Sequence, residues 1–136
     1  MKIVLDTNVL VSGLLSPFGA PGEIVRMTSA GLLQLCHDAR IISEYRQVLL
    51  RPKFGFNQAQ VSVLLDQIQS CGQTTASKPL DQPLPDPDDE PFLEVALAGR
   101  VSCLVTGNLK DYPAALRQGA KVLAPLDFLK FYRTES

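Results

Sequence analysis

The stretch that decides the fold is Met1-Lys2-Ile3-Val4-Leu5-Asp6-Thr7-Asn8, at the start of the chain. Continuous Val, Ile and Leu residues are typical of a strand that is buried on both faces, as in parallel sheets. We therefore expect a strand over residues 2–6 and a helix over residues 7–15, with Asp6 or Thr7 as its cap. Ligands of open α/β sheets bind outside the carboxyl ends of the strands, so Asp6 is expected at the edge of the sheet that binds ligands.

Strand-like and helix-like segments alternate along the rest of the chain, which is typical of a parallel sheet with crossover helices. Further strands are expected over residues 32–36, 73–76, 102–105 and 121–123. Further helices are expected over residues 23–30, between the Asp38 cap and Arg51-Pro52, and over residues 57–71, 90–98, 111–118 and 125–132.

Length and composition favour one ordinary globular domain, expected over residues 1–136. The apolar fraction of 46% and the charged fraction of 20% argue against a disordered chain. The net charge of −1 means that the protein as a whole does not attract nucleic acid electrostatically. A nucleic-acid enzyme is still compatible with this charge, because clustered carboxylates neutralised by bound metal lower the formal charge and can hide a local group of basic residues. Three cysteines and one histidine are too few for a disulfide framework or a zinc site. The histidine, His37, is expected at a strand end or facing solvent.

Targeting signals are not found in the sequence. Asp6 interrupts the N-terminal apolar run too early for a secretory signal, and no run reaches the ~20 apolar residues of a membrane helix. We therefore expect a cytoplasmic protein with no membrane partner.

Acidic residues fall close to the expected carboxyl ends of strands or at the starts of the following helices. They are Asp6, Glu44, Asp86, Asp88, Asp89, Glu90 and Asp111. These points share one edge of a parallel sheet, so the acids are expected to converge. Converging carboxylates cannot all ionise cheaply, and a hard divalent cation such as Mg²⁺ or Mn²⁺ relieves their repulsion. Such a site is suited to metal-assisted phosphodiester hydrolysis.

Each acid also has an ordinary explanation. Asp6 can be only a helix cap, and Glu44 can be only a solvated surface residue. The acids of residues 86–90 can complement a helix dipole, while Asn108 and Asp111 can be turn residues. The arrangement as a whole is more specific, because its order matches one protein family.

The sequence resembles the PIN-domain ribonucleases, in particular the VapC-like toxins of bacterial and archaeal toxin–antitoxin pairs. Four segments carry this resemblance in family order, namely IVLDTNV at residues 3–9, SEY at 43–45 with VLLRPKF at 48–54, DPDD at 86–89, and VTGN at 105–108 with DY at 111–112. Each motif alone is weakly specific, whereas four in order are specific for the fold and the site.

The resemblance implies an α/β fold, a three-layer α/β/α sandwich on a central, mostly parallel sheet. It also implies an endoribonuclease that depends on Mg²⁺ or Mn²⁺ and leaves 5′-phosphate and 3′-hydroxyl ends. The protein would be the toxin of a type II toxin–antitoxin pair, with RNA as substrate, a cognate antitoxin protein as partner and a homodimer as its assembly.

The resemblance also assigns residues. Asp6, Glu44 and Asp89 match the catalytic, metal-binding acids, and the further metal ligands would be Asp86, Asn108 and Asp111. The supporting residues would be Thr7, Asn8 and Thr106. Asn108 departs from the aspartate that is common in this subgroup, and asparagine offers an oxygen without a charge. The alternative function is therefore a catalytically impaired PIN-like module that binds RNA or a protein partner.

Basic and aromatic residues in or near the motifs are candidates for holding RNA. The basic candidates are Arg46, Arg51, Lys53 and Lys110, with Arg40 as a further one. Phe54, Phe56 and Tyr112 can stack on single-stranded bases. Two other classes are disfavoured. Flap-type DNA nucleases need more chain than this, and a signalling receiver domain needs a lysine after its last strand, where Lys121 instead begins one.

Overall fold

The computed structural model describes residues 1–135, so Ser136, the last residue of the expected domain, lies outside the described residues. Within them, parallel strands form one sheet in the order β3-β2-β1-β4-β5. The strands are β1 (Lys2–Leu5), β2 (Gln34–His37), β3 (Gln73–Thr74), β4 (Cys103–Val105) and β5 (Val122–Leu123). The predicted α/β class and parallel sheet are confirmed.

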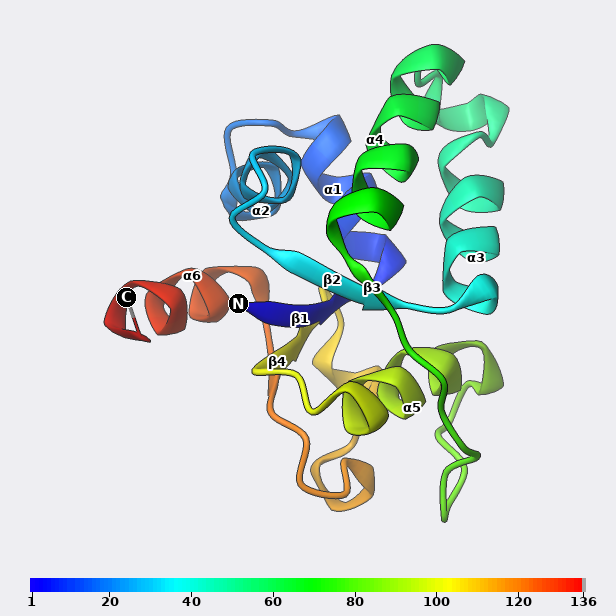
Figure 1. The fold of residues 1–136 in the computed structure, drawn as a ribbon, viewed down its shortest axis with the longest axis vertical. Coiled ribbons are helices and arrows are strands. Elements are labelled where there is room, and N and C mark those ends of the chain that lie inside the picture. Colours follow the sequence, from blue (N-terminus) through cyan, green and yellow to red (C-terminus); the bar gives the residue numbers. More distant parts are fainter. Residues whose placement is uncertain (136) are drawn as a thin grey trace.

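Helices cover both faces of this sheet, which gives the predicted three-layer sandwich (Figure 1). They are α1 (Thr7–Leu15), α2 (Ala20–Ser29), α3 (Ala39–Leu49), α4 (Gln58–Cys71), α5 (Glu90–Gly99) and α6 (Pro125–Glu135). Figure 1 shows α1, α2 and α4 on one side of β1 and β2, and α5 on the other side. None of the helices within residues 1–135 combines the length and apolar character needed to cross a membrane.

Several predicted bounds differ from the structure by a few residues, and proline explains two of the differences. The second helix begins at Ala20 rather than at residue 23, because Pro21 lies in its first turn, where a missing N–H is tolerated. The expected helix over residues 111–118 is instead a pair of 3₁₀ turns, η3 (Leu109–Asp111) and η4 (Ala114–Leu116). Pro113 separates them, since a proline disfavours helical backbone at the residue before it.

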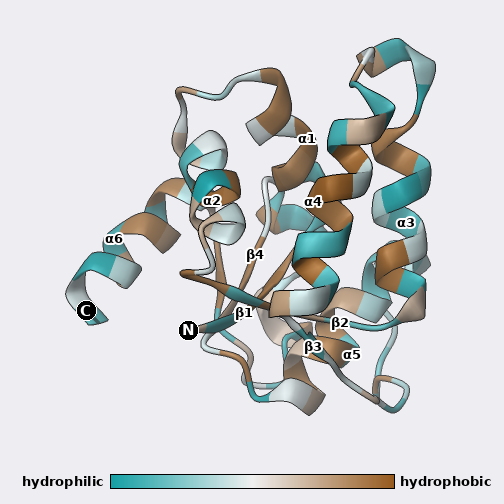
Figure 2. Ribbon diagram, turned by 45° about the horizontal axis from the view of Figure 1, so that its top comes forward, coloured by the Kyte–Doolittle hydropathy of each residue, from teal (hydrophilic) through white to brown (hydrophobic). Residues whose placement is uncertain are grey.

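The helix α3 is amphipathic and begins at a side-chain cap, as expected. Asp38 Oδ1 accepts a hydrogen bond from the backbone N–H of Ile41 at 3.0 Å. Ile41 and Tyr45 are buried on one face, while Arg46 is exposed on the other, and Figure 2 shows hydrophobic and hydrophilic turns along this helix. Glu44 is half-buried at the border of the two faces.

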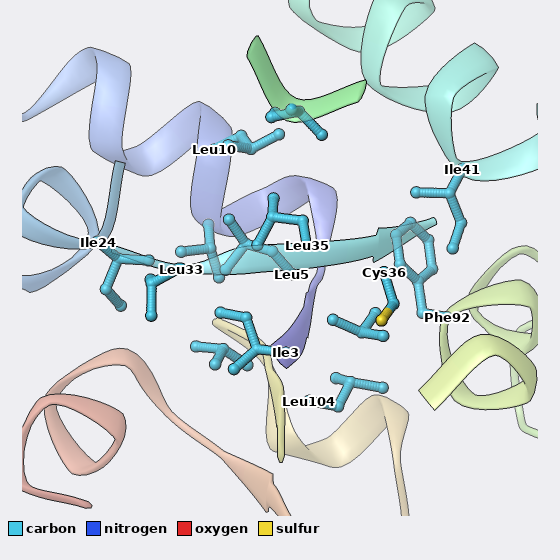
Figure 3. Close-up of a cluster of buried hydrophobic side chains, with 14 of the residues drawn as sticks. Ile3, Leu5, Leu10, Ile24, Leu33, Leu35, Cys36, Ile41, Phe92 and Leu104 are labelled. Carbon is cyan, nitrogen blue, oxygen red and sulfur yellow. The ribbon is translucent and has the colours of Figure 1, made fainter. Parts of the chain in front are cut away.

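The hydrophobic core is centred on β1, whose residues Ile3, Val4 and Leu5 are fully buried. Figure 3 shows side chains of α1, α2, α3 and α5 gathered around β1 and its neighbours β2 and β4. A fully buried aliphatic side chain contributes about 1.5–3 kcal/mol, so this cluster holds the strand ends, and the residues that follow them, in place.

His37 is the one histidine of the chain, and of its two expected settings the structure shows the strand end. It lies at the end of β2, as one of the two expectations had it, but its side chain is only 3% exposed. Burial lowers the pKa of His37, so the imidazole is neutral at neutral pH and adds no positive charge to this edge.

Candidate active site

The topological switch point of the sheet lies between β1 and β4, because the chain order runs from β1 to β2 and β3 on one side and to β4 and β5 on the other. Open α/β sheets bind their ligands at such a point. Asp6 directly follows β1, and its backbone N–H donates to the carbonyl oxygen of Val105, the last residue of β4, at 2.9 Å. Asp6 and Thr106 therefore emerge side by side at the switch point.

Two hydroxyl groups hold the carboxylate of Asp6 in place at this switch point. Its Oδ2 accepts hydrogen bonds from Thr106 Oγ1 at 2.9 Å and from Tyr112 Oη at 3.0 Å. Asp6 occupies the N-cap position of α1 but makes no side-chain cap hydrogen bond, so the ordinary explanation of Asp6 as a cap alone is wrong. Burial, with the side chain 4% exposed, raises the pKa of Asp6, and the two donors offset part of that rise.

Glu44 is brought to the same place by α3. Thr7, the residue after Asp6, donates its hydroxyl hydrogen bond to Glu44 Oε2. The neighbouring Tyr45 is buried and donates to the carbonyl oxygen of Leu5 at 2.5 Å, which anchors α3 on the end of β1. Burial raises the pKa of Glu44, and the charge of Asp6 raises it further.

Asp89 ends the 3₁₀ turn η2 (Pro87–Asp89) and immediately precedes α5. Burial raises its pKa to about 7, with contributions from the negative charges of Asp6, Asp111, Asp86 and Glu44. Its Oδ2 is buried and has no hydrogen-bond partner among the described residues. Burial and the charges of four neighbouring acids therefore act together on the carboxyl group of Asp89.

Asp86 is exposed and closes the turn that carries Asp89. Its Oδ1 accepts from the backbone N–H of Asp88 at 2.9 Å, and its carbonyl oxygen accepts from the backbone N–H of Asp89 at 3.1 Å. Because its charge also raises the pKa of Asp89, Asp86 lies at the border of the acidic cluster. Its assignment as a metal ligand stays a prediction.

The segment after β4 supplies the remaining predicted ligands. The amide of Asn108 donates to Asp111 Oδ1 at 3.1 Å, and its backbone N–H donates to Thr106 Oγ1 at 3.1 Å. The charge of Asp111 raises the pKa values of both Asp6 and Asp89. Asp111 thus belongs to the cluster, and Asn108 orients it.

Asn8, a predicted supporting residue, ties α1 to the same segment. Its Oδ1 accepts from the backbone N–H of Gly107 at 2.9 Å, and its Nδ2 is 3.5 Å from Thr106 Oγ1. A Cβ atom at Gly107 would lie 3.2 Å from Asn8 Oδ1, so this close approach favours glycine. All three predicted supporting residues, Thr7, Asn8 and Thr106, contact the acids or the turn that holds them.

The donor set fits a divalent cation in its chemistry. The cluster offers only oxygen ligands, its carboxylates raise one another's pKa values, and one buried oxygen of Asp89 is unpartnered. The side chains do not form a ready-made coordination shell, since no three His, Cys, Asp or Glu groups within residues 1–135 are placed to share an ion.

The basic residues predicted to contact RNA lie in different surroundings. Arg51 is close enough for its positive charge to lower the pKa of Glu44. Lys53 lies over the ring of Phe54, 5.1 Å from its centroid. Arg46 is exposed on α3, and Lys110 is exposed in the turn between Asn108 and Asp111.

Two sequence-based interpretations of side chains near the site are corrected. Tyr112 does not stack on bases, because it is fully buried and its hydroxyl contacts Asp6. Arg40 is not a free RNA contact, because its guanidinium pairs with Asp38 and Glu94. Only the position of Tyr112, directly after Asp111, could have indicated its role.

Comparisons with known proteins identify the family of this chain. The family model described as PIN domain matches residues 2–110. Uncharacterized protein MJ1680 of Methanocaldococcus jannaschii is 26% identical to this chain over 111 residues, which cover 79% of the chain and 71% of that protein. The family match spans Asp6, Glu44, Asp89 and Asn108, and it covers well over half of the sequence. The chain therefore belongs to the PIN domain family.

Proposed function

We propose that this protein is an endoribonuclease that depends on Mg²⁺ or Mn²⁺ and hydrolyses RNA phosphodiester bonds. PIN domains are generally metal-dependent nucleases, and the family suggests RNA binding. The observation that carries the proposal is the convergence of Asp6, Glu44 and Asp89 from three distant segments at the switch point of the sheet. Mutual repulsion of this kind does not stabilise the fold, and strongly perturbed carboxyl groups in a crevice are typical of functional sites.

The residues have distinct roles in this proposal. Asp6, Glu44 and Asp89 would hold the ion, with Asp86, Asn108 and Asp111 as further oxygen donors. A bound divalent ion neutralises charge on the phosphate and lowers the pKa of water.

Three hydroxyl donors prepare the acids for this role. Thr106 and Tyr112 orient Asp6, and Thr7 orients Glu44, before any ligand arrives. Donors of this kind reduce the reorganisation that binding requires.

Phosphate contacts would come from basic residues at the rim of the acidic cluster. Arg51 is the first candidate because its charge already acts on Glu44, and Arg46, Lys53 and Lys110 are the others. Binding of this type weakens as salt concentration rises, because cations are released from the RNA when arginine and lysine contact its phosphates. Phe54 and Phe56 stack on each other with ring centroids 5.5 Å apart and offer an aromatic surface for an unpaired base.

We also propose that the protein is the toxin of a type II toxin–antitoxin pair, acting in the cytoplasm as a homodimer with a cognate antitoxin. The four sequence motifs and their order support this part of the proposal. Expression in a bacterial host should arrest growth, and D6N should relieve the arrest. Growth that stops equally with both forms would contradict toxicity through RNA cleavage.

The direct test is RNA cleavage by purified, chelator-treated protein. Fluorescent single-stranded RNA should be cleaved on addition of Mn²⁺ or Mg²⁺, leaving 5′-phosphate ends, while D6N should be inactive with its circular dichroism spectrum unchanged. D66N, which removes an exposed carboxylate of α4, is the matched control and should cleave as the wild type does. Equal cleavage by wild type and D6N would refute the assignment.

A module that binds RNA or a protein partner without cleaving RNA is the second candidate. The observation in its favour is the uncharged Asn108 in the fourth motif, together with the lack of a ready-made three-ligand group in the described part of the chain. Mn²⁺-independent RNA binding with no cleavage at any metal concentration would select this candidate over the enzyme.

A further inference from the structure

An ion pair joins α3 to α5, the helices that deliver two of the three acids. Arg40 Nη1 on α3 lies 2.7 Å from Glu94 Oε1 on α5. The same guanidinium lies 2.7 Å from Oδ2 of Asp38, the cap of α3, and donates to Ser77 Oγ at 3.2 Å in the loop that leads toward η2. Arg40 therefore links the start of α3, the middle of α5 and the loop at Ser77.

Two side-chain contacts join α3 and α5. Arg40 contacts Glu94, and Tyr45 packs on Phe92 with ring centroids 6.2 Å apart. In Figure 1, α3 and α5 cross at a steep angle, so the two helices meet over a short stretch. Both contacts lie within a few residues of an acid, since Glu44 directly precedes Tyr45 and Asp89 lies three residues before Phe92.

Each partner of the ion pair lies close in the sequence to one acid of the cluster, Arg40 to Glu44 and Glu94 to Asp89. Glu44 lies four residues after Arg40 on the same face of α3, or ~6 Å along the axis. Asp89 lies five residues before Glu94, at the N-cap position of α5. The ion pair therefore joins the helix that carries Glu44 to the helix that Asp89 caps.

The ion pair is built to hold its partners in one geometry. Glu94 is only 9% exposed, so its carboxylate requires a partner. The guanidinium satisfies both Glu94 and Asp38, and its planar fork fixes their relative positions better than a lysine would. Arg40 thus does more than neutralise a surface charge.

We propose that Arg40 is a positioning residue, whose pair with Glu94 sets the separation of Glu44 and Asp89 and thereby the affinity of the site for a divalent cation. The inference rests on the proposed function, because it assumes that those two acids share an ion. Neither Arg40 nor Glu94 would contact the ion or the RNA.

Calorimetric titration with Mn²⁺ tests this inference without any cleavage assay. The variants are R40Q, which removes the cation, and E94Q, which keeps a hydrogen-bonding oxygen but removes the charge. R133Q is the matched control, because it removes an arginine–glutamate pair between α6 and α2, away from the acids. Thermal unfolding confirms that each titrated variant is folded, and E94Q remains available for the test if R40Q does not fold.

The sign of the effect separates positioning from simple electrostatics. Through charge alone, removing Arg40 would tighten binding of a cation, whereas removing the charge of Glu94 would weaken it. If positioning dominates, both variants weaken Mn²⁺ binding, by about tenfold, as is typical for residues that support metal ligands. The control should change affinity less than twofold.

The outcomes distinguish the inference from the function on which it rests. Weaker binding by both R40Q and E94Q, with R133Q unchanged, supports the positioning role. Unchanged binding, or opposite changes in the two variants, overturns that role and leaves the proposed nuclease intact. A wild-type protein that binds no Mn²⁺ overturns the proposed function, and the positioning role with it.

Discussion

Replacing Asp89 with asparagine should stabilise the metal-free protein at pH 8. Burial and the neighbouring carboxylates raise the pKa of Asp89 to about 7, compared with ~4 in an unfolded chain. Between these values the folded state binds more protons than the unfolded state, so the free energy of unfolding falls as pH rises. At pH 8 the folded protein must keep a repelled carboxylate charged, whereas at pH 5 that carboxylate is mostly protonated.

The size of the effect follows from the exposure of the carboxyl group. The full displacement of the pKa of Asp89 would correspond to about 4 kcal/mol. Asp89 is only partly buried, and solvent screens the charges around it, so we expect about 1–2 kcal/mol. Asparagine is as good a residue as aspartate at a helix cap, so the substitution should not weaken the start of α5.

Urea denaturation followed by far-ultraviolet circular dichroism measures this difference, with chelator present, at pH 5 and pH 8. D89N should be more stable than the wild type at pH 8, and the difference should be smaller at pH 5, vanishing only below the unfolded-state pKa of ~4. The control D66N should differ from the wild type by less than about 0.5 kcal/mol at both pH values. Saturating Mn²⁺ should make the wild type more stable than D89N at pH 8. A ligand present at 100 times its Kd adds ~2.7 kcal/mol to the free energy of unfolding of the protein that binds it. A D89N variant that is less stable than the wild type at pH 8 would refute the reasoning.

Three further substitutions probe the same cluster. D6N should abolish Mn²⁺-dependent RNA cleavage with the fold retained, as gel assays and circular dichroism would show, and wild-type activity would exclude Asp6 from the site. Y112F removes a donor to Asp6, so Mn²⁺ affinity in a calorimetric titration should fall about tenfold, and an unchanged affinity would count against an orienting role. R51Q should weaken RNA binding equally across sequences and reduce the slope of log K against log salt by about 1. An unchanged salt dependence would show that Arg51 makes no phosphate contact.

The fold could be predicted because its signals are local. The apolar run of β1 indicates a strand buried on both faces, and Asp38 is a recognisable helix cap that the structure confirms. The predicted helices were wrong next to two prolines, because a proline can either lie in the first turn of a helix or interrupt one. Pro21 is inside a helix because it lies in the first turn, whereas Pro113 interrupts one, and the local pattern alone does not separate these cases.

The candidate site could be predicted only in its list of acids. A parallel sheet brings the carboxyl ends of its strands to one edge, so Asp6, Glu44 and Asp89 were expected to converge. The distances at which they meet depend on how α3 and α5 pack, and no motif encodes that packing. The folded chain accordingly brings the acids close enough to raise one another's pKa values, but no three of them within residues 1–135 are placed to share an ion.

Tyr112 and Arg40 show most clearly what the sequence leaves undetermined. An aromatic or basic residue beside a motif is compatible with RNA contact, and nothing in the neighbouring residues argues otherwise. In the folded chain Tyr112 is buried with its hydroxyl on Asp6, 106 residues away, and Arg40 reaches Glu94, 54 residues away. Partners at such separations are decided by the packing of whole helices and strands.

The sequence by itself determined the α/β class, the parallel sheet and the acids at its edge, because hydrophobic pattern and helix capping act over a few residues. Only the tertiary structure decided which hydroxyl groups hold Asp6, how strongly burial and repulsion raise the pKa of Asp89, and which ion pair joins α3 to α5. Burial and Coulomb interaction depend on distances between groups that are far apart in the chain, and those distances exist only once the layers have packed.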